Sequence, residues 1–187
     1  EAVEARAHSL PLPPLLANAT TLYTLRDMLS PALCERVISE ARRVGFAQSP
    51  HLAANTVLQV SVHRSTKLLA IFHAMYEALR PFVRARYDAE LVRWEDPTSV
   101  PQFRAACNDA FVSQYVAGPK YAGISLHRDA EDFAFVAQLN ARDFDGGGTF
   151  YPHYGPHTTQ LAQGDLGVHP GFVLHGGAPI TSGERFI

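Results

Sequence analysis

The stretch from Tyr115 to Arg185 decides the fold of this 187-residue chain. It begins with YVAGPKYAGISLHRD (residues 115–129) and ends with LGVHPGFVLHGGAPITSGER (residues 166–185). Short apolar runs alternate here with turn signals such as Gly118-Pro119 and Gly155-Pro156. This spacing indicates short β-strands joined by tight turns.

The strand pattern starts at Ala110 and continues to the last residue. About eight strands within about 80 residues favour a jelly roll or β-sandwich over alternating βαβ units. We expect Asp145–Gly148 to be one of the turns, because it combines Asp with three glycines. The expected strands are Phe111–Val116, Ile124–His127, Phe133–Leu139, Thr149–Tyr151, Thr158–Leu161, Leu166–Val168, Phe172–Leu174 and Arg185 onward.

The first 109 residues carry the helical signals. Ser30-Pro31 is typical of a helix start, and Gly45 of the end of the same helix. A second helix is predicted from Ser65, with Pro81 as its kink or end. Further expectations are an extended lead-in at residues 8–20, strands at Thr21–Leu25 and Thr56–Val62, a loop at residues 46–56, and an irregular segment at residues 88–108 that contains Trp94. We therefore predict one domain over residues 1–187, mainly β with flanking helices: residues 1–109 form a helical support region for a β core at residues 110–187.

Composition disfavours several classes of protein. Hydrophobic residues make up 47% and charged residues 18% of the chain, so a sizeable core is expected and global disorder is not. Lys and Arg number 16 against 18 Asp and Glu, without a basic stripe, which disfavours a nucleic-acid partner. No apolar run has the length of a membrane span. We expect a soluble protein of the cytoplasm or of the ER lumen and secretory pathway.

The two cysteines, Cys34 and Cys107, form neither a disulfide framework nor a CxxC metal motif, and their pairing stays open. Asn18 begins a glycosylation sequon, which matters only in a secreted protein. The chain starts at Glu1 and stops at Ile187 within an apolar strand pattern. We therefore expect an excised or processed domain. Oligomeric state stays open.

His127, Asp129 and His175 are the candidate metal ligands. In a strand, residues two apart point to the same side, so His127 and Asp129 share one face. His175 follows Asp129 by 46 residues and ends an expected strand, so it joins the pair only through the fold. A His-x-Asp pair alone is common by chance, and a lone buried His often bonds the backbone. Together, two imidazoles and one carboxylate are the donor set of non-haem Fe(II) sites.

Arg185 lies ten residues after His175, beyond the Ser182-Gly183 turn signal. A strand that leaves His175 and returns brings Arg185 near the metal ligands. Phe186 and Ile187 favour a strand in the core layer. Because a guanidinium fork suits bidentate binding of a carboxylate, this arginine suggests a carboxylate-bearing co-substrate.

These residues carry a family resemblance. The segment from Tyr115 to Ile187 resembles the catalytic domain of the prolyl 4-hydroxylase and lysyl hydroxylase group of 2-oxoglutarate/Fe(II) dioxygenases, and the helix start at Leu29–Ile38 resembles it more weakly. The matching marks are Gln114-Tyr115, His127-Arg128-Asp129, Leu139-Asn140, Phe144–Thr149, Gly164-Asp165, His169-Pro170-Gly171 and His175–Ile187. Arg185 and the His-Pro-Gly string resemble the lysyl type. Gln138 departs from the pattern, because some relatives have a co-substrate-binding tyrosine there.

The resemblance implies a double-stranded β-helix with Fe(II) bound by His127, Asp129 and His175. Arg185 is expected to bind the distal carboxylate of 2-oxoglutarate, with Tyr115 assisting. The implied reaction uses O₂, with ascorbate as a supporting reductant, and hydroxylates a peptidyl proline or lysine while 2-oxoglutarate becomes succinate and CO₂. Substrate is expected over loops such as residues 46–60 and Tyr151–His157.

Two other functions stay open on sequence alone. One is a dioxygenase for a free amino acid, small metabolite or modified base. The other is a catalytically silent jelly-roll module that binds peptide. The remaining histidines receive duller interpretations: His153 and His157 are expected in an exposed loop without a second metal, and His169 is expected to be structural, at a turn.

Overall fold

The computed structural model describes residues 22–48, 57–87, 110–129 and 133–187. The chain divides into two units, one formed by Glu1–Val60 with Val112–Ile187 and the other by Ser61–Phe111. Five sequence-based expectations fall outside the described residues. They concern the lead-in at residues 8–20, the sequon at Asn18, most of the loop at residues 46–56, the segment with Trp94, and Cys107.

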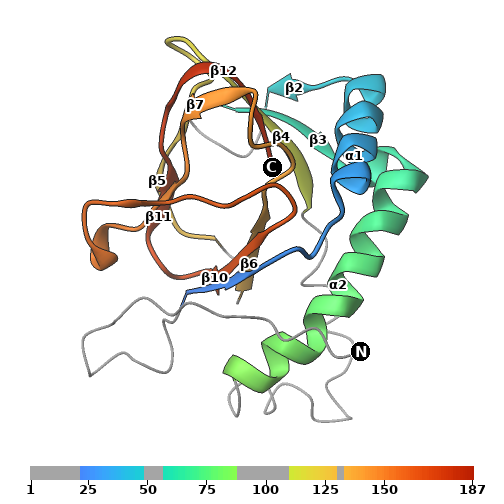
Figure 1. Ribbon diagram of the computed structural model, residues 1–187, viewed down its shortest axis with the longest axis horizontal. Helices are drawn as coiled ribbons and strands as arrows, with labels where there is room; N and C mark the ends of the chain where they lie inside the picture. The colour runs from blue at the N-terminus through green and yellow to red at the C-terminus, as the bar shows by residue number, and fades with distance from the viewer. Residues whose placement is uncertain (1–21, 49–56, 88–109, 130–132) are drawn as a thin grey trace. The chain divides into compact units, whose positions relative to one another are not determined.

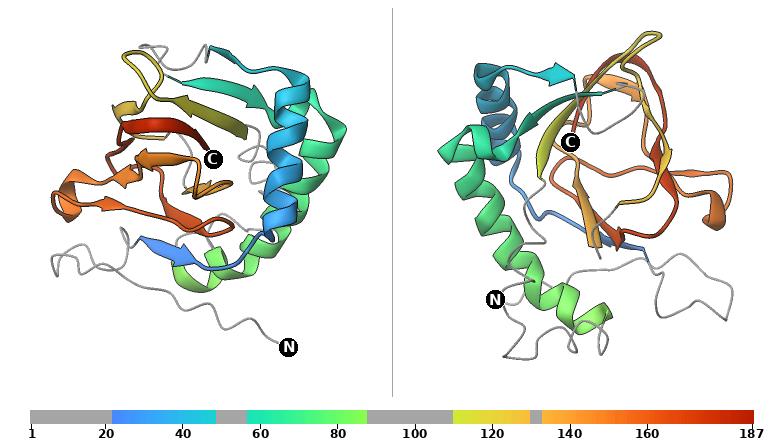
Figure 2. Two further views of the ribbon diagram at one scale, coloured as in Figure 1. Left: turned by 45° about the horizontal axis from the view of Figure 1, so that its top comes forward. Right: turned by 180° about the vertical axis from the view of Figure 1, so that it is seen from behind.

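The strands lie in three sheets, and every pairing whose register is defined is antiparallel. The first has the order β1 (Tyr23–Leu25), β10 (Leu166–Pro170), β6 (Phe133–Ala137). The second has the order β5 (Ile124–His127), β11 (His175–Gly177), β8 (Thr149–Phe150), β9 (Thr158–Thr159). The third has the order β2 (Ala47–Gln48), β3 (Leu58–Ser61), β4 (Phe111–Val116), β12 (Ile180–Phe186), β7 (Phe144–Gly146). Figures 1 and 2 show the strands of the first unit curling around a common interior, which is the mainly β roll that the sequence predicts.

Helix α1 spans Pro31–Val44 and confirms the strongest local signal of the first half. The Ser30 side chain accepts a hydrogen bond from the backbone N–H of Leu33 at 3.3 Å, so it caps an otherwise unsatisfied donor. Gly45 ends the helix at φ 94°, a conformation that glycine adopts without steric cost. Near the end of α1, Arg42 donates to the Glu184 carboxylate on β12 at 2.9 Å. The contact ties α1 to the strand that carries Arg185.

The second unit contains the short helix η1 (Val62–Arg64) and helix α2 (Thr66–Tyr87). Pro81 does not end this helix, because the helix continues to Tyr87, so of the two expected effects of Pro81 the end of the helix is wrong. A proline removes one backbone hydrogen bond, and the good helix formers Ala78, Leu79 and Arg80 precede it. In the part of the chain that the structure describes, no helix combines the length and apolarity needed to cross a membrane.

Three strand predictions need correction around the candidate site. The strand expected from Arg185 onward begins earlier, because β12 runs from Ile180 to Phe186 through the Ser182-Gly183 turn signal. The apolar run Phe172–Leu174 is not a strand: the backbone turns there, with Val173 N–H donating to Pro170 O at 3.1 Å, and β11 begins at His175. Phe172 is 53% exposed, so its apolar character does not reflect burial. The glycine-rich segment expected as a turn contains β7, which ends at Gly146. Glycine adds no side-chain pattern, so the strand gave no periodic signal.

Two groups of buried residues flank the candidate site. Val57, Tyr115 and Ile180 form one cluster, with each side chain at most 3% exposed. Leu22, Tyr151 and Val173 form the other. Tyr115 stands on β4 beside β12, and Tyr151 follows β8, so each cluster supports a side chain that borders the site described next.

Candidate metal centre and the neighbouring arginine

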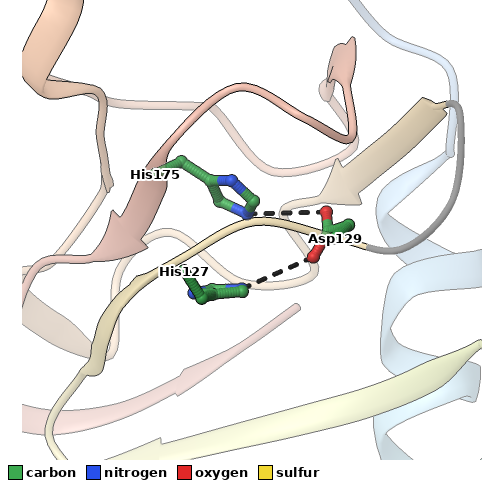
Figure 3. Close-up of side chains that lie close together, drawn as sticks. All are labelled: His127, Asp129 and His175. Atoms are coloured by element: carbon green, nitrogen blue, oxygen red, sulfur yellow. Dashed lines mark ion pairs between the residues drawn. The ribbon is translucent and has the colours of Figure 1, made fainter.

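The structure brings His127, Asp129 and His175 together. His127 ends β5 and His175 begins β11, and the two are direct Cα partners across this antiparallel pair. Asp129 follows β5, and its backbone N–H donates to Gly171 O at 2.9 Å. One potential ligand atom from each of the three residues lies within 4.8 Å of the others. In Figure 3 each imidazole points to a different oxygen of the Asp129 carboxylate, with Nε2–oxygen distances of 3.5 Å for His127 and 3.6 Å for His175.

Both histidines have the tautomer that metal binding requires. Nδ1 of His127 lies 2.9 Å from Ser125 O, and Nδ1 of His175 lies 2.9 Å from Val173 O. A carbonyl oxygen only accepts, so Nδ1 carries the proton in each ring. The lone pair therefore remains on Nε2, the nitrogen that faces Asp129. Such second hydrogen bonds are the usual means of orienting metal-binding imidazoles.

The charges at the site also suit a cation. Burial alone acts to raise the pKa of Asp129, but the contact with His127 and the proximity of His175 and His169 outweigh it, so the pKa is lowered. The Asp129 carboxylate is the main cause that raises the pKa of His127, whereas burial lowers the pKa of His175. Asp129 is thus ionised at neutral pH. Two imidazole nitrogens and one anionic oxygen are a donor set that is known to bind Fe(II).

Access to the three side chains is one-sided. His127 and Asp129 keep 28% and 22% of their side-chain surface exposed, whereas His175 keeps 7%. On the His175 side, glycines let β5 and β11 approach closely. A Cβ on Gly176 would lie 2.9 Å from Ile124 O, and one on Gly123 would lie 2.6 Å from Gly177 O. The close approach fixes the imidazoles relative to each other and leaves the His127–Asp129 side for ligands.

Arg185 is a buried cation. It lies on β12, directly opposite Tyr115 on β4, and the two side chains are 1% and 2% exposed. Its Cζ is 5.3 Å from the centroid of the Tyr115 ring, and its Nε donates to Gln138 Oε1 at 2.9 Å. No carboxylate among the described residues pairs with it. Burial lowers the pKa of Arg185 and raises that of Tyr115 to about 12, so at neutral pH the phenol keeps its proton and can donate.

Arg185 is held from its backbone as well. Asn140 donates from Nδ2 to Glu184 O at 2.8 Å and accepts at Oδ1 from Phe186 N–H at 2.8 Å. The side chain thus bonds the backbone on both sides of Arg185, as a neighbouring strand would. Gly147 adds space: a Cβ there would lie 3.3 Å from Cδ of Arg185.

Sequence reasoning underestimated His169 and Tyr151. His169 is not at a turn: it lies in β10, is 0% exposed, and its ring centroid is 4.3 Å from that of His175. Burial lowers its pKa to about 4. Tyr151 packs against both rings, with centroids 5.5 Å from His169 and 6.0 Å from His175. The apolar residues on either side of His169 were the available signal, because they extend the strand through it.

The loop histidines are exposed, as the sequence predicts. They are His153, in the short helix η2 (Pro152–Tyr154), and His157. Within residues 22–48, 57–87, 110–129 and 133–187, His127, Asp129 and His175 are the group of three or more metal-binding side chains that the structure brings together.

Known proteins resemble this chain in structure. No protein-family model and no curated protein sequence matches it. A Pseudomonas putida prolyl-4-hydroxylase superposes with a TM-score of 0.58 and 15% identity, over 91% of this chain and 90% of that one. SnoN, a non-haem alpha-ketoglutarate-dependent epimerase from nogalamycin biosynthesis, gives 0.58 and 14% identity, over 92% of this chain and 78% of SnoN. SnoK, a non-haem alpha-ketoglutarate-dependent carbocyclase from the same biosynthesis, gives 0.54 and 13% identity, over 92% and 79%.

Because the sequence identities are only 13–15%, the similarity to these structures establishes the fold alone. The agreement extends over nine-tenths of the chain and includes enzymes with different reactions. Together with the three antiparallel sheets it confirms the predicted fold class. The chain has the jelly-roll, double-stranded β-helix fold of these enzymes, with helices added to the β core.

Proposed function

We propose that this chain is an Fe(II)- and 2-oxoglutarate-dependent dioxygenase that hydroxylates proline or lysine residues of a peptide or protein. The observation that carries the proposal is the combination of the His127–Asp129–His175 cluster with a buried arginine that has no anionic partner in the described part of the chain. SnoN, one of the enzymes with this fold, has been crystallised with Fe³⁺ and alpha-ketoglutarate.

The three side chains would hold the iron through Nε2 of His127, Nε2 of His175 and the Asp129 carboxylate. Both imidazoles are already in the required tautomer, so binding needs no proton rearrangement within the rings. Three protein ligands leave further coordination positions for other molecules.

Arg185 would bind the distal carboxylate of 2-oxoglutarate. A guanidinium buried to 1% exposure is costly without an anion, and a bound carboxylate removes that cost. Tyr115 supplies a phenol that stays protonated and so can donate to the same carboxylate. Its ring also stacks near the guanidinium and keeps water away from it.

When bound, the iron supplies O₂ activation coupled to oxidative decarboxylation of 2-oxoglutarate, which gives succinate and CO₂. The residues of the chain supply position and environment. Tyr151 and His169 cover the buried side of His175 and exclude water there. The partly exposed side of His127 and Asp129 is where a substrate C–H would approach.

Two observations support different substrates. The His169-Pro170-Gly171 and His175–Ile187 marks, with the prolyl-4-hydroxylase among the structural neighbours, support a peptide. SnoN and SnoK act in nogalamycin biosynthesis, and SnoN has been crystallised with nogalamycin RO, which supports a non-peptide substrate as the second candidate.

The test measures succinate from 2-oxoglutarate with Fe(II), O₂ and ascorbate, with and without a pool of proline- and lysine-containing peptides. Peptide-dependent succinate, together with one added oxygen on a proline or lysine, is the expected result. Succinate without peptide oxidation would favour the second candidate. A folded, iron-loaded protein that neither binds 2-oxoglutarate nor forms succinate would refute the proposal and favour a silent peptide-binding module.

A further inference from the structure

Gln138 is the side chain that fixes the orientation of the Arg185 guanidinium. It follows β6 and lies 47 residues before Arg185 in the chain, yet its Oε1 accepts the hydrogen bond from Arg185 Nε at 2.9 Å. Gln138 is 1% exposed. The contact is therefore a buried polar pair, which strengthens in a region from which water is excluded.

The orientation of the Gln138 amide follows from its other contacts. Nε2 donates to two backbone carbonyl oxygens, that of Asn140 at 2.5 Å and that of Phe186 at 3.3 Å. Carbonyl oxygens do not donate, and Arg185 Nε does not accept, so only one orientation of the amide satisfies all three contacts. Gln138 is thus locked by the backbone on either side, and it transfers that rigidity to Arg185.

The bond to Nε decides which edge of the guanidinium is left for a ligand. An arginine can bind a carboxylate through Nε and one Nη, or through its two terminal Nη atoms. Gln138 occupies Nε, so the terminal pair remains. The Cζ of Arg185 lies over the Tyr115 ring at 5.3 Å from its centroid. Rotation to present the other edge would therefore break the Gln138 bond and disturb the contact with Tyr115.

The neutrality of Gln138 matters as much as its geometry. An ionised carboxylate at this position would pair with Arg185 and neutralise it before any ligand arrived. An amide accepts the same hydrogen bond and leaves the positive charge uncompensated. Among the described residues Arg185 indeed has no anionic partner. The guanidinium of Arg185 is thus held in one orientation while its positive charge stays uncompensated, as a preorganised anion site requires.

We propose that Gln138 is a positioning residue for the co-substrate: it holds Arg185 by Nε so that both Nη atoms and the full charge face the distal carboxylate of 2-oxoglutarate. The inference rests on the proposed function. It assigns the selection of a dicarboxylate 2-oxo acid to the Gln138–Arg185 pair rather than to Arg185 alone.

The test compares two ligands that differ only in the distal half. 2-Oxoglutarate carries the distal carboxylate, and pyruvate lacks it. Both are titrated into Mn(II)-loaded protein without O₂, and Mn(II) affinity and circular dichroism are measured on each variant. The variants are Gln138→Met, which removes the acceptor at similar length, and Gln138→Glu, which keeps the acceptor but adds a negative charge. The matched control is Gln163→Leu, because Gln163 donates to Leu139 O at 2.9 Å in the same segment without a contact to Arg185.

For Gln138→Met we expect the Kd of 2-oxoglutarate to rise about 10- to 100-fold, the range for one hydrogen bond to a charged group. The Kd values of pyruvate and Mn(II) should stay within about twofold of wild type, as should all three for Gln163→Leu. Gln138→Glu should weaken 2-oxoglutarate further than Gln138→Met does. In an Arg185→Met background the Gln138→Met change should have little further effect on 2-oxoglutarate, because the two residues act through one contact.

Two results would overturn the inference while the proposed function stands. One is a folded Gln138→Met protein that prefers 2-oxoglutarate to pyruvate as strongly as wild type. The other is an equal loss of both ligands, which a merely structural role predicts. If Gln138→Met does not fold, Gln138→Asn carries the same test, because its amide can still donate to a backbone carbonyl but is one methylene too short to hold Arg185 Nε at the same time. A wild-type protein without preference for 2-oxoglutarate would refute the proposed function and the inference with it.

Discussion

Replacing Arg185 with methionine separates co-substrate binding from folding. Methionine has a similar unbranched shape, and it removes the buried charge together with the donors to a carboxylate. In the protein without 2-oxoglutarate, the loss of the Gln138 bond and the Tyr115 contact opposes the gain from no longer burying a cation. Each of these effects amounts to about 1–3 kcal/mol, so we expect the free energy of unfolding to change little.

Binding of 2-oxoglutarate should change far more. Loss of two hydrogen bonds from the guanidinium to a carboxylate corresponds to about 3–6 kcal/mol, or a Kd at least about 100-fold higher. At a 2-oxoglutarate concentration of 100 times the wild-type Kd, the ligand stabilises wild type by about 2.7 kcal/mol. The same concentration is at most equal to the Kd of the variant, and stabilisation falls to about 0.4 kcal/mol or less.

The assay is thermal unfolding of Mn(II)-loaded protein with and without 2-oxoglutarate. For a protein of this size the wild-type ligand effect corresponds to a Tm increase of about 5–10 °C, which the variant should almost lose. Arg185→Lys serves as the matched control: it retains the charge but not the planar fork, so its ligand effect should be intermediate. An Arg185→Met protein with an undiminished Tm increase, or one that loses Mn(II) and 2-oxoglutarate equally, would contradict the role given to Arg185.

Three further outcomes test the site. His175→Ala should lower metal affinity at least about 100-fold and abolish succinate formation, while the circular dichroism spectrum stays that of wild type. Metal titration and a succinate assay measure both effects. Undiminished metal binding would exclude His175 as a ligand. Burial lowers the pKa of His169 to about 4 from its ordinary 6.5, so below pH 6.5 the unfolded state binds a proton that the folded state does not. The free energy of unfolding should therefore be highest above pH 6.5 and fall by up to about 3 kcal/mol as the pH drops towards 4. Urea unfolding across that range should show a shallower decline for His169→Gln, and identical slopes would mean that His169 does not titrate as described. Gly176→Ala would place a Cβ 2.9 Å from Ile124 O and should lower the free energy of unfolding by about 1–3 kcal/mol and weaken metal binding. The control is Gly167→Ala, whose Cβ would lie at an ordinary 3.5 Å from its nearest neighbour and should lower the free energy of unfolding by less than about 1 kcal/mol. Equal losses in urea unfolding would contradict the close approach of β5 and β11.

Local signals predicted the elements that depend on nearby residues. Helix α1 begins with the Ser30 cap and ends at Gly45, as its sequence indicates, because both devices act within one helical turn. β4 and β5 have the predicted bounds for a similar reason: turn residues limit them on the chain itself. The jelly roll followed from the density of such short strands.

Contacts that depend on the closed roll were not predictable in the same way. Gln138 follows β6 and Arg185 lies 47 residues later within β12, so no spacing rule relates them. β11 consists of His175, Gly176 and Gly177, and its two glycines produce no alternation to recognise. The apolar run before β11 predicted a strand at Phe172–Leu174 instead. His169 was placed at a turn because proline follows it, but β10 extends through Pro170.

The pairing of His127 with His175 has a consequence for the order of assembly. The two residues are adjacent across β5 and β11 but 48 positions apart in the chain. Contacts between residues so far apart in the chain form late in folding, because closing the intervening loop costs conformational entropy before the contact adds any stability. An ion held by both histidines closes this segment as a reversible cross-link, and the chain-entropy relation for cross-links gives about 4 kcal/mol for a loop of this length. A nascent chain offers only the local pair of His127 and Asp129. We therefore expect metal to bind after the β roll has formed. It would then stabilise the folded state without initiating folding.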